Sequence, residues 1–487
     1  MPTWLREFLP ILILLVAVGI VFARLPRIEM GYSARFLSRR RWNWLPLGLT
    51  YAFLYMGRYN LKVAKYAFES LPGADGGVMM GNDAFGVIFG AGTIVYGASF
   101  LINGPLTDRF GGRFAILLGA AGAAVANLLM GLVSWSLWKQ GPGHELLTAN
   151  FVMVFSVLYA LNMYFQSFGA VAIVKVNSGW FHVRERGVFG AIFGILISLG
   201  IYFAFDWSGL VLKYLGLAWV FMVPAILLAI FWVIDVFVVR NHPEQAGLEE
   251  IALGDATDGD DGPRLPAAKV FAMMLRNPII MTIAIIEFCS GWLRQAIMQW
   301  YGSFAKQTDA VLGLRDSFVN ENWGMLLCVA GIMGGVVAGT ISDHVFGSRR
   351  GPVAALLYGV MLIGAVVMVF AYQQPWVGWL VLVMSLAVIG VHGMLSGTAS
   401  MDFGGSKNAG IAVGLIDGFV YLGTGLMSFT YAVILPKEQL DTAGNLIGPA
   451  TEPSNWSAWP ISMVPLALVG LVLALRIRNA KPKAKTA

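Results

Sequence analysis

Residues Tyr51 to Lys65 read YAFLYMGRYNLKVAK and belong to an apolar run long enough to cross a bilayer. Arg58 falls near the middle of this run, where burying a guanidinium costs roughly 3 kcal/mol on insertion scales, so it needs a partner or a water-filled cavity. Helical spacing places two cations and three phenols on or beside one face of the helix. These residues are Tyr51, Tyr55, Arg58, Tyr59 and Lys62. Such a face is suited to hold an anion.

A second stretch repeats this arrangement far along the chain. Residues Glu287 to Tyr301 read EFCSGWLRQAIMQWY, with Arg294 deep inside another apolar run. The two arginines predict an anion-binding site between two helices. The alternative is that each arginine pairs structurally with a buried acid, and Glu287 lies on the same helical face as Arg294.

The composition defines the class of protein. Of the 487 residues, 57% are hydrophobic and 12% are charged, whereas a soluble protein carries roughly 25% charged residues. We therefore expect an all-α membrane protein with many spans. Cys289 and Cys328 lie in expected spans and form neither a disulfide framework nor a metal-site spacing. No phosphate-binding loop, zinc spacing or nucleophile motif is visible, so we expect no enzymatic activity, no metal and no cofactor.

Runs of about 20 apolar residues indicate membrane spans. The expected spans are 9–22, 46–69, 84–104, 114–136, 150–174, 187–206, 216–238, 278–302, 322–342, 352–372, 378–398, 410–433 and 459–476. The first span has neither a strongly basic start nor a clear cleavage site, which favours an uncleaved anchor over a signal peptide.

Basic residues sort to one side of this map. Most of the 33 Lys and Arg residues fall in loops that face the cytoplasm if the N-terminus lies outside. This predicts an inner-membrane protein with a cytoplasmic C-terminus, and it explains the net charge of +6 without nucleic acid. The acidic, Gly- and Pro-rich residues 254–269 read GDATDGDDGPRLPAAK and are typical of a linker. The expected units are an extra helix with its basic connection (1–43), a six-helix bundle (44–239), a linker (240–277) and a second bundle with a basic tail (278–487).

A loop motif occurs twice. Gly104–Arg113 reads GPLTDRFGGR, and residues 339–350 read GTISDHVFGSRR. The separation between Asp108 and Asp343 nearly equals that between Arg58 and Arg294. The first copy resembles the G-x-L-x-D-R-x-G-R-R loop of the major facilitator superfamily, which implies an all-α fold of two six-helix bundles, here with one extra N-terminal helix.

The same resemblance implies a gate. We expect Asp108 to cap a helix start and to pair with a neighbouring arginine across the bundle. The alternative is a simple turn with positive charge retained on the cytoplasmic side. The expected gate residues are Asp108, Arg109, Arg113, Asp343, Arg349 and Arg350.

Further stretches resemble the organophosphate:phosphate antiporter family. They are Trp180–Gly187 (WFHVRERG), Phe165–Gly169 (FQSFG), 402–414 (DFGGSKNAGIAVG), 418–423 (GFVYLG) and 241–247 (NHPEQAG). In that family two buried arginines, one in each half, hold phosphate, and the resemblance gives Arg58 and Arg294 this role. The other expected substrate contacts are Tyr55, Tyr59, Lys62, Tyr96, Gln166, Gln295 and His392. Each polar residue of this set has a helix–helix hydrogen bond as its alternative, and Lys62 could instead extend toward the membrane interface.

The resemblance implies exchange of an organophosphate for inorganic phosphate by alternating access. We expect a monomer whose partners are the small anion and the bilayer. The family's pocket histidine and a pocket lysine fall on Ile197 and Phe100 here, which leaves the organic group open. Two rival functions remain. One is a proton-coupled symporter of another organic anion, with Glu287 or Asp417 as proton carrier, and the other is a non-transporting sensor of phosphate esters.

Overall fold

The computed structural model describes residues 30–74, 77–182, 185–251, 266–346, 350–395, 409–441 and 443–479, together with isolated positions 12, 16, 19 and 253. The extra span predicted over 9–22 lies almost wholly outside these residues. The regular structure of the described chain is helical apart from an isolated bridge between Pro72 and Val78 and one two-stranded antiparallel sheet, in which Gln439 pairs with Ile447 and Leu440 with Leu446. The predicted all-α, multi-span architecture is confirmed.

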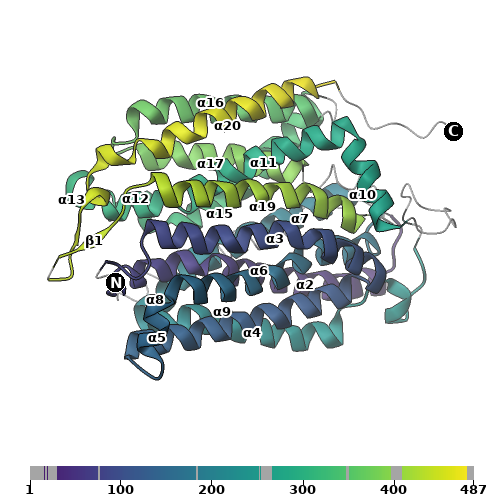
Figure 1. The fold of residues 1–487 in the computed structure, drawn as a ribbon. Coiled ribbons are helices and arrows are strands. Elements are labelled where there is room, and N and C mark those ends of the chain that lie inside the picture. The colour runs from purple at the N-terminus through teal and green to yellow at the C-terminus, as the bar shows by residue number, and fades with distance from the viewer. Residues whose placement is uncertain are drawn as a thin grey trace.

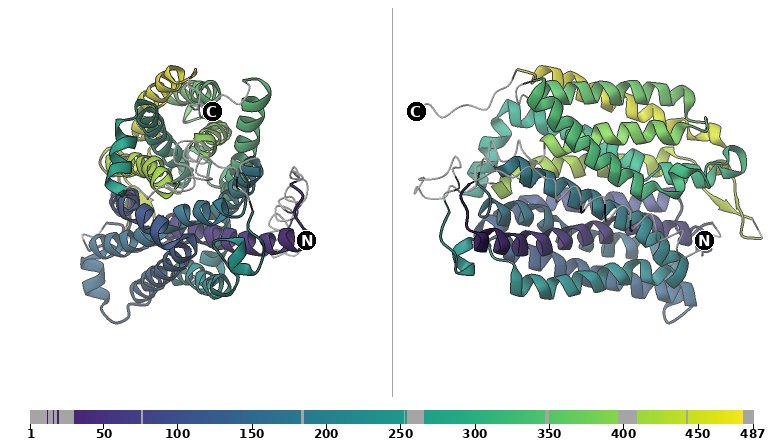
Figure 2. Two further views of the ribbon diagram at one scale, coloured as in Figure 1. Left: turned by 90° about the vertical axis from the view of Figure 1, so that its right-hand side faces the viewer. Right: turned by 180° about the vertical axis from the view of Figure 1, so that it is seen from behind.

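The helices form two stacked groups, one from each part of the chain (Figure 1 and Figure 2). The first group contains α2 (Ala34–Phe68), α3 (Asn82–Phe110), α4 (Gly112–Lys139), α5 (His144–Ala149), α6 (Phe151–Ser178), α7 (Arg186–Tyr202), the π-helical segment η2 (Phe203–Trp207), α8 (Ser208–Leu215) and α9 (Leu217–Val238). Two short helices, η3 (Pro243–Ala246) and α10 (Ala267–Arg276), come next in the chain.

The second group follows α10. It contains α11 (Pro278–Met298), α12 (Tyr301–Gln307), α13 (Asp309–Leu312), α14 (Phe318–Glu321), α15 (Trp323–His344), α16 (Arg350–Ala371), α17 (Val377–Met394), α19 (Ala409–Ile434), β1 (Gln439–Leu440), β2 (Leu446–Ile447), η5 (Pro449–Thr451), η6 (Pro453–Trp456) and α20 (Ala458–Arg476). The groups meet where α3 packs along α19 and where α7 packs along α15.

Ten helices of the described chain are long and apolar enough to cross a membrane. Two expected spans, α2 and α15, are not among them. In α2 the charges of Arg58, Lys62 and Lys65 lower the hydropathy, although the helix is 35 residues long and all three side chains are buried. In α15 the apolar stretch covers Trp323–Gly339, which is shorter than the other candidate spans. Hydropathy thus fails for α2 because its polar face points into the protein rather than into lipid.

Capping residues define several helix ends. The Ser33 hydroxyl accepts from the Phe36 N–H at 3.2 Å, so α2 begins well before the expected residue 46. The Asn277 side chain accepts from the Ile279 N–H at 2.9 Å, and Pro278 occupies the first turn of α11, where its missing N–H costs nothing. Gly111, at a φ of +89°, makes the sharp turn between α3 and α4.

Glycines set the close approach of α11 to α19. A Cβ added at Gly291 would lie 2.0 Å from the Val420 carbonyl oxygen, and one added at Gly423 would lie 2.1 Å from the Phe288 carbonyl oxygen. The two backbones therefore touch directly, as small residues allow in membrane helices. Arg294 lies about one turn after Gly291 on α11, and Tyr421 directly follows Val420 on α19.

Replacing Gly423 with alanine should separate α11 from α19. We expect Gly423→Ala to destabilise the protein by about 1–3 kcal/mol, because the new methyl group overlaps backbone that cannot rotate away. Thermal unfolding in detergent measures the change. Gly359→Ala on α16 is the matched control, since nothing lies within 4 Å of an added Cβ there. Equal melting temperatures for the two variants would contradict the close-contact account.

Candidate anion-binding site

Arg58 lies at the meeting point of the two helix groups. Its side chain is fully buried, and Nε donates to the Gln166 Oε1 atom on α6 at 3.0 Å. Nη1 donates to the Tyr421 hydroxyl on α19. Within the described part of the chain, Nη2 has no hydrogen-bond partner. Arg58 thus contacts both groups and keeps one guanidinium nitrogen available.

Tyrosine rings surround the Arg58 guanidinium. Its central carbon lies 4.4 Å from the Tyr55 ring centroid and 4.6 Å from that of Tyr96. The rings of Tyr421 and Tyr59 follow at 5.5 and 5.9 Å. Cations within about 6 Å of an aromatic face are attracted by the ring quadrupole, and more strongly when water is excluded. These rings therefore offset part of the cost of burying the charge.

One face of α6 holds the backbone of α2 at this point. The Tyr159 hydroxyl donates to the Arg58 carbonyl at 2.8 Å, and Asn162 Nδ2 donates to the Gly57 carbonyl at 2.9 Å. Gln166 Nε2 in turn donates to Asn162 Oδ1 at 3.0 Å. Asn162 thus joins α6 to the backbone of α2, and Gln166 joins Asn162 to the Arg58 guanidinium. Such a chain of buried hydrogen bonds limits the positions that Arg58 can adopt.

Arg294 approaches the same tyrosines from α11. Its side chain is buried, and neither Nε nor Nη2 finds a hydrogen-bond partner among the described residues. Its charge interacts electrostatically with Tyr55, Tyr59 and Tyr421, all of which also interact with Arg58. The next residue, Gln295, donates to the Tyr59 hydroxyl at 2.9 Å. The two arginines therefore share one aromatic surrounding, in which three of their nitrogens have no partner among the described residues.

Glu287 does not neutralise Arg294 directly. Its Oε2 atom lies 2.9 Å from Nδ1 of His392 on α17. The ion pairs found between described residues include none with Arg58 or Arg294. The structure thus places His392, predicted as a substrate contact, beside Glu287 rather than among the tyrosines.

The remaining predicted contacts lie around this centre. Tyr96 stacks on Tyr421 with ring centroids 3.9 Å apart. Lys62, one turn beyond Arg58, donates to the Ser303 hydroxyl on α12 and lies 4.9 Å from the Phe85 ring. Asp417 is half-buried on α19 and interacts electrostatically with Tyr96.

The predicted gate motif is placed differently from expectation. Asp108 lies in the last turn of α3 and does not cap the next helix, because the chain turns at Gly111 before α4 begins. Its Oδ1 atom pairs with Lys175 on α6 at 2.7 Å. Arg113 donates to the Val236 carbonyl at 2.6 Å, and Arg109 is exposed beside Phe110. In the second copy Arg350 begins α16, whereas Arg349 and the Asp343 side chain lie outside the described residues.

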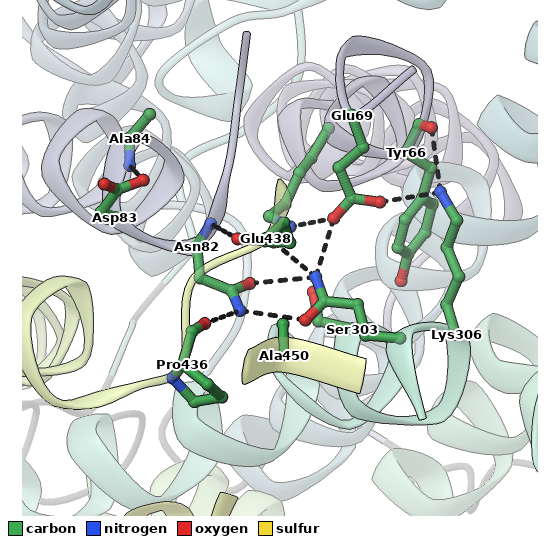
Figure 3. Close-up of polar contacts among 12 residues, drawn as sticks. Tyr66, Glu69, Asn82, Asp83, Ala84, Ser303, Lys306, Pro436, Glu438 and Ala450 are labelled. Carbon is green, nitrogen blue, oxygen red and sulfur yellow. Dashed lines mark hydrogen bonds and ion pairs between the residues drawn. The ribbon is translucent and has the colours of Figure 1, made fainter. Parts of the chain in front are cut away.

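A polar junction links the two groups at the end where α2 stops and α3 starts (Figure 3). It consists of Lys65, Glu69, Asn82, Lys306, Gln307 and Glu438. Lys65 pairs with Glu438 at 2.9 Å and also with Glu69, and Lys306 pairs with Glu69 at 2.7 Å. The Asn82 N–H donates to Glu438 at 2.7 Å, while Gln307 donates to both carboxylates. The junction therefore ties α2 and α3 to α12 and to the segment after α19.

The two carboxylates of the junction differ in their protonation behaviour. Burial raises the pKa of Glu69, but the charges of Lys65 and Lys306 outweigh burial and hold that pKa below its usual range. Burial raises the pKa of Glu438 above its usual value, with Lys65 opposing this effect and Glu69 adding to it. Glu69 is therefore the carboxylate that stabilises the junction as an anion.

Sequence reasoning missed Tyr421 and Ser303 as contacts of the basic side chains. Tyr421 stood within a recognised motif, and a helical count from Asp417 places it one turn away on the same face. No local pattern indicated Ser303, since it reaches Lys62 only after α12 folds against α2. The junction was also missed, because its members come from four separate segments.

The fold and the polar centre define a class of protein. The sequence profile of the Major Facilitator Superfamily matches residues 47–428, so the chain belongs to this superfamily of membrane transporters and not to an enzyme family. The solved structure of a point mutant of the nucleoside transporter NupG aligns with a TM-score of 0.58 over 89% of this chain and 97% of that one. At 14% identity, this likeness supports the fold alone.

Relatives that align over most of the chain include glycerol-3-phosphate transporters, hexose phosphate transport proteins and a membrane sensor, which agrees with the predicted resemblance to the organophosphate:phosphate antiporter family. The glycerol-3-phosphate transporter of Bacillus subtilis is 25% identical over 81% of this chain and 84% of its own. The membrane sensor protein UhpC of Salmonella typhimurium is 27% identical over 83% of this chain and 87% of its own. The probable hexose phosphate transport protein of Chlamydia pneumoniae is 22% identical over 80% of this chain and 81% of its own.

Replacing Glu69 with glutamine should weaken the polar junction. We expect Glu69→Gln to destabilise the protein by about 3 kcal/mol at neutral pH, because Lys65 and Lys306 lose the anion they share. Since the pKa of Glu69 is lowered in the folded protein, its contribution is complete above the usual carboxyl pKa of roughly 4.3 and declines as the pH falls below it. Thermal unfolding measured at several pH values tests both points.

The control for this measurement is Glu321→Gln, which changes an exposed glutamate. Its melting temperature should follow that of the wild type at every pH. The gap between wild type and Glu69→Gln should narrow on acidification, and a gap that stays constant would argue against a stabilising anion at position 69.

Proposed function

We propose that this protein exchanges an organophosphate for inorganic phosphate across the inner membrane. The observation that carries the proposal is the pair of buried arginines, Arg58 and Arg294, which flank the same tyrosines and retain three unpartnered nitrogens among the described residues. Buried donors in proteins are nearly always satisfied, so unpartnered guanidinium nitrogens indicate a place for a ligand. The names of the relatives, which include glycerol-3-phosphate and hexose phosphate transport, point to the same chemistry.

The phosphoryl group would lie between the two guanidinium groups. Arg58 Nη2 and Arg294 Nε and Nη2 can each donate to a phosphate oxygen, and charge-assisted bonds of this kind are stronger than neutral ones. A guanidinium stays charged when water is excluded and presents a planar fork that suits phosphate. Lys62 would add positive potential one turn away, and Gln295 would keep Tyr59 in position.

Alternating access would come from rocking of two bundles, 44–239 and 278–487, joined by the linker 240–277. The polar junction links these bundles at one end, so it has to separate before the site can open there. The bias of basic residues makes this the outer end and leaves the C-terminus in the cytoplasm. In this proposal Asp108, Arg109, Arg113, Asp343, Arg349 and Arg350 act at the opposite, cytoplasmic end.

Exchange rather than one-way transport follows from the charge of the site. An empty site would hold two cations without an anion between them. Rocking of the bundles around this uncompensated charge in the low-dielectric membrane is disfavoured. A bound phosphoryl group neutralises this charge, so either substrate allows the bundles to rock. The shared phosphoryl group explains how two different substrates can use one site.

A sensor is the second candidate, because one relative carries the name of a membrane sensor protein. A sensor would bind phosphate esters at the same arginines without carrying them across. Binding of phosphate to the purified protein, together with no counterflow in vesicles, would favour this candidate over the exchanger.

Lysine at either arginine position should abolish exchange. In Arg58→Lys and Arg294→Lys the charge remains but the forked pair of donors is lost, so phosphate affinity should fall roughly tenfold to a hundredfold. The measurement is counterflow of labelled phosphate into proteoliposomes loaded with unlabelled phosphate. Both variants should remain folded, as judged by thermal unfolding.

Arg315→Lys serves as the control, because Arg315 is exposed between α13 and α14. It should exchange phosphate at the wild-type rate. Normal counterflow in Arg58→Lys or in Arg294→Lys would exclude the two-arginine site, and no counterflow in a well-folded wild type would exclude phosphate exchange.

A further inference from the structure

The proposed phosphate site gives no role to a buried acidic group on the helix that carries Arg294. Glu287 on α11 is fully buried, and its Oε2 atom lies 2.9 Å from His392 Nδ1 on α17. In the described chain its other oxygen, Oε1, has no hydrogen-bond partner. The His392 side chain remains 13% exposed. Among the described residues, the Glu287 carboxylate has an imidazole as its hydrogen-bond partner and forms no ion pair with a lysine or an arginine.

Several titratable groups lie on the helices packed around Glu287. Tyr358 on α16 and Cys289 on α11 interact with it electrostatically, and neither is a cation. On α19, Asp417 interacts with Tyr96, and Tyr421 interacts with Arg58. On α10, Lys269 and Arg276 are exposed, and the only basic residue of α20 is Arg476 at its end. Among the described residues, Arg294 is a fixed cation whose charge interacts with Glu287.

We infer that Glu287 and His392 form a proton-binding site whose occupancy is linked to the anion at Arg294. This inference rests on the proposed phosphate site. With a carboxylate and a neutral imidazole the pair carries one negative charge. One proton taken from water makes the pair neutral, either as carboxylic acid and imidazole or as carboxylate and imidazolium. No other co-reactant is needed, and the proton returns to water when the pair releases it.

The linkage is electrostatic. Glu287 and Arg294 are seven residues apart on one helix, which places them on the same face and about 10 Å apart. While Arg294 is free, its positive charge stabilises the anionic pair. A bound phosphoryl group cancels that charge and adds negative charge, so the pair then gains from taking up a proton. At this separation the effect amounts to about tenfold in affinity, and it is reciprocal between proton and anion.

Both members of the pair belong to the same helix group, in contrast to the polar junction. The pair therefore keeps its geometry while the two groups move relative to each other. Such a site can carry a proton along with the anion through the whole transport cycle. A proton taken up with the phosphoryl group would couple transport to the proton gradient.

The test is to count the protons taken up when inorganic phosphate binds to the purified full-length protein. Calorimetric titrations in two buffers of different ionisation enthalpy give this number, and the dissociation constant is measured between about pH 6 and pH 8, the range in which histidine titrates. Phosphate itself changes protonation in this range, so the comparison with Glu287→Gln is decisive. Glutamine mimics the neutral carboxyl group and keeps the contribution of phosphate unchanged.

In the wild type we expect up to one more proton taken up per phosphate than in Glu287→Gln. At the alkaline end the variant should bind phosphate about tenfold more tightly than the wild type, because the opposing negative charge is gone. His392→Gln is the second variant, should Glu287→Gln fail to fold, and it should change the pH at which the extra proton is taken up, because only the carboxyl group remains to bind it. Ser385→Ala is the control, since Ser385 is a buried, non-titrating residue of α17 seven positions from His392.

Equal proton uptake in wild type and variants would overturn the inference and leave the phosphate site intact. A variant that loses affinity for an organophosphate but shows the wild-type proton count would make Glu287 a substrate contact, which also overturns it. If phosphate does not bind to the wild type at all, the proposed arginine site and this inference fail together. Counterflow measured on the same preparations separates these results from a failure of exchange alone.

Discussion

The structure depends on keeping two guanidinium groups charged inside membrane-spanning helices. Arg58 meets this constraint by a hydrogen bond to Gln166, a second to Tyr421 and four tyrosine faces around it. Arg294 shares part of the same aromatic surrounding. Among the described residues, no carboxylate forms an ion pair with either arginine. In the proposed function, an anion that comes from outside the protein supplies the negative charge.

Packing places the two arginines around shared tyrosines. The glycine contacts between α11 and α19 bring Arg294 and Tyr421 onto neighbouring helices, and α3 along α19 brings Tyr96 against Tyr421. The hydrogen bonds from α6 to the backbone of α2 then hold Arg58 opposite them. Each of these contacts acts over a short distance, yet together they join helices that lie far apart in the chain.

Two clusters of ionisable groups have different positions relative to the interface between the helix groups. The polar junction crosses that interface, so its ion pairs depend on how the two groups sit against each other. The Glu287–His392 pair lies within one group and is independent of that movement. A cluster that crosses the interface, such as the polar junction, suits a gate. A cluster within one helix group, such as the Glu287–His392 pair, suits a proton site that keeps its geometry while the bundles move. This difference assigns separate proposed roles to acids that look alike in the sequence.

The sequence by itself determined the all-α membrane architecture, most of the spans and the two arginines, because hydropathy and a charge within an apolar run are local properties. The predicted resemblance to the major facilitator superfamily is confirmed. Only the tertiary structure decided which groups meet: Tyr421 with Arg58, Ser303 with Lys62, and His392 with Glu287 rather than with the tyrosines. Asp108 shows the same limit, since its place in the last turn of α3 and its pairing with Lys175 depend on where the helix ends and what packs beside it. Partners of this kind are separated by up to several hundred residues, and helix packing, which no local pattern encodes, brings them together.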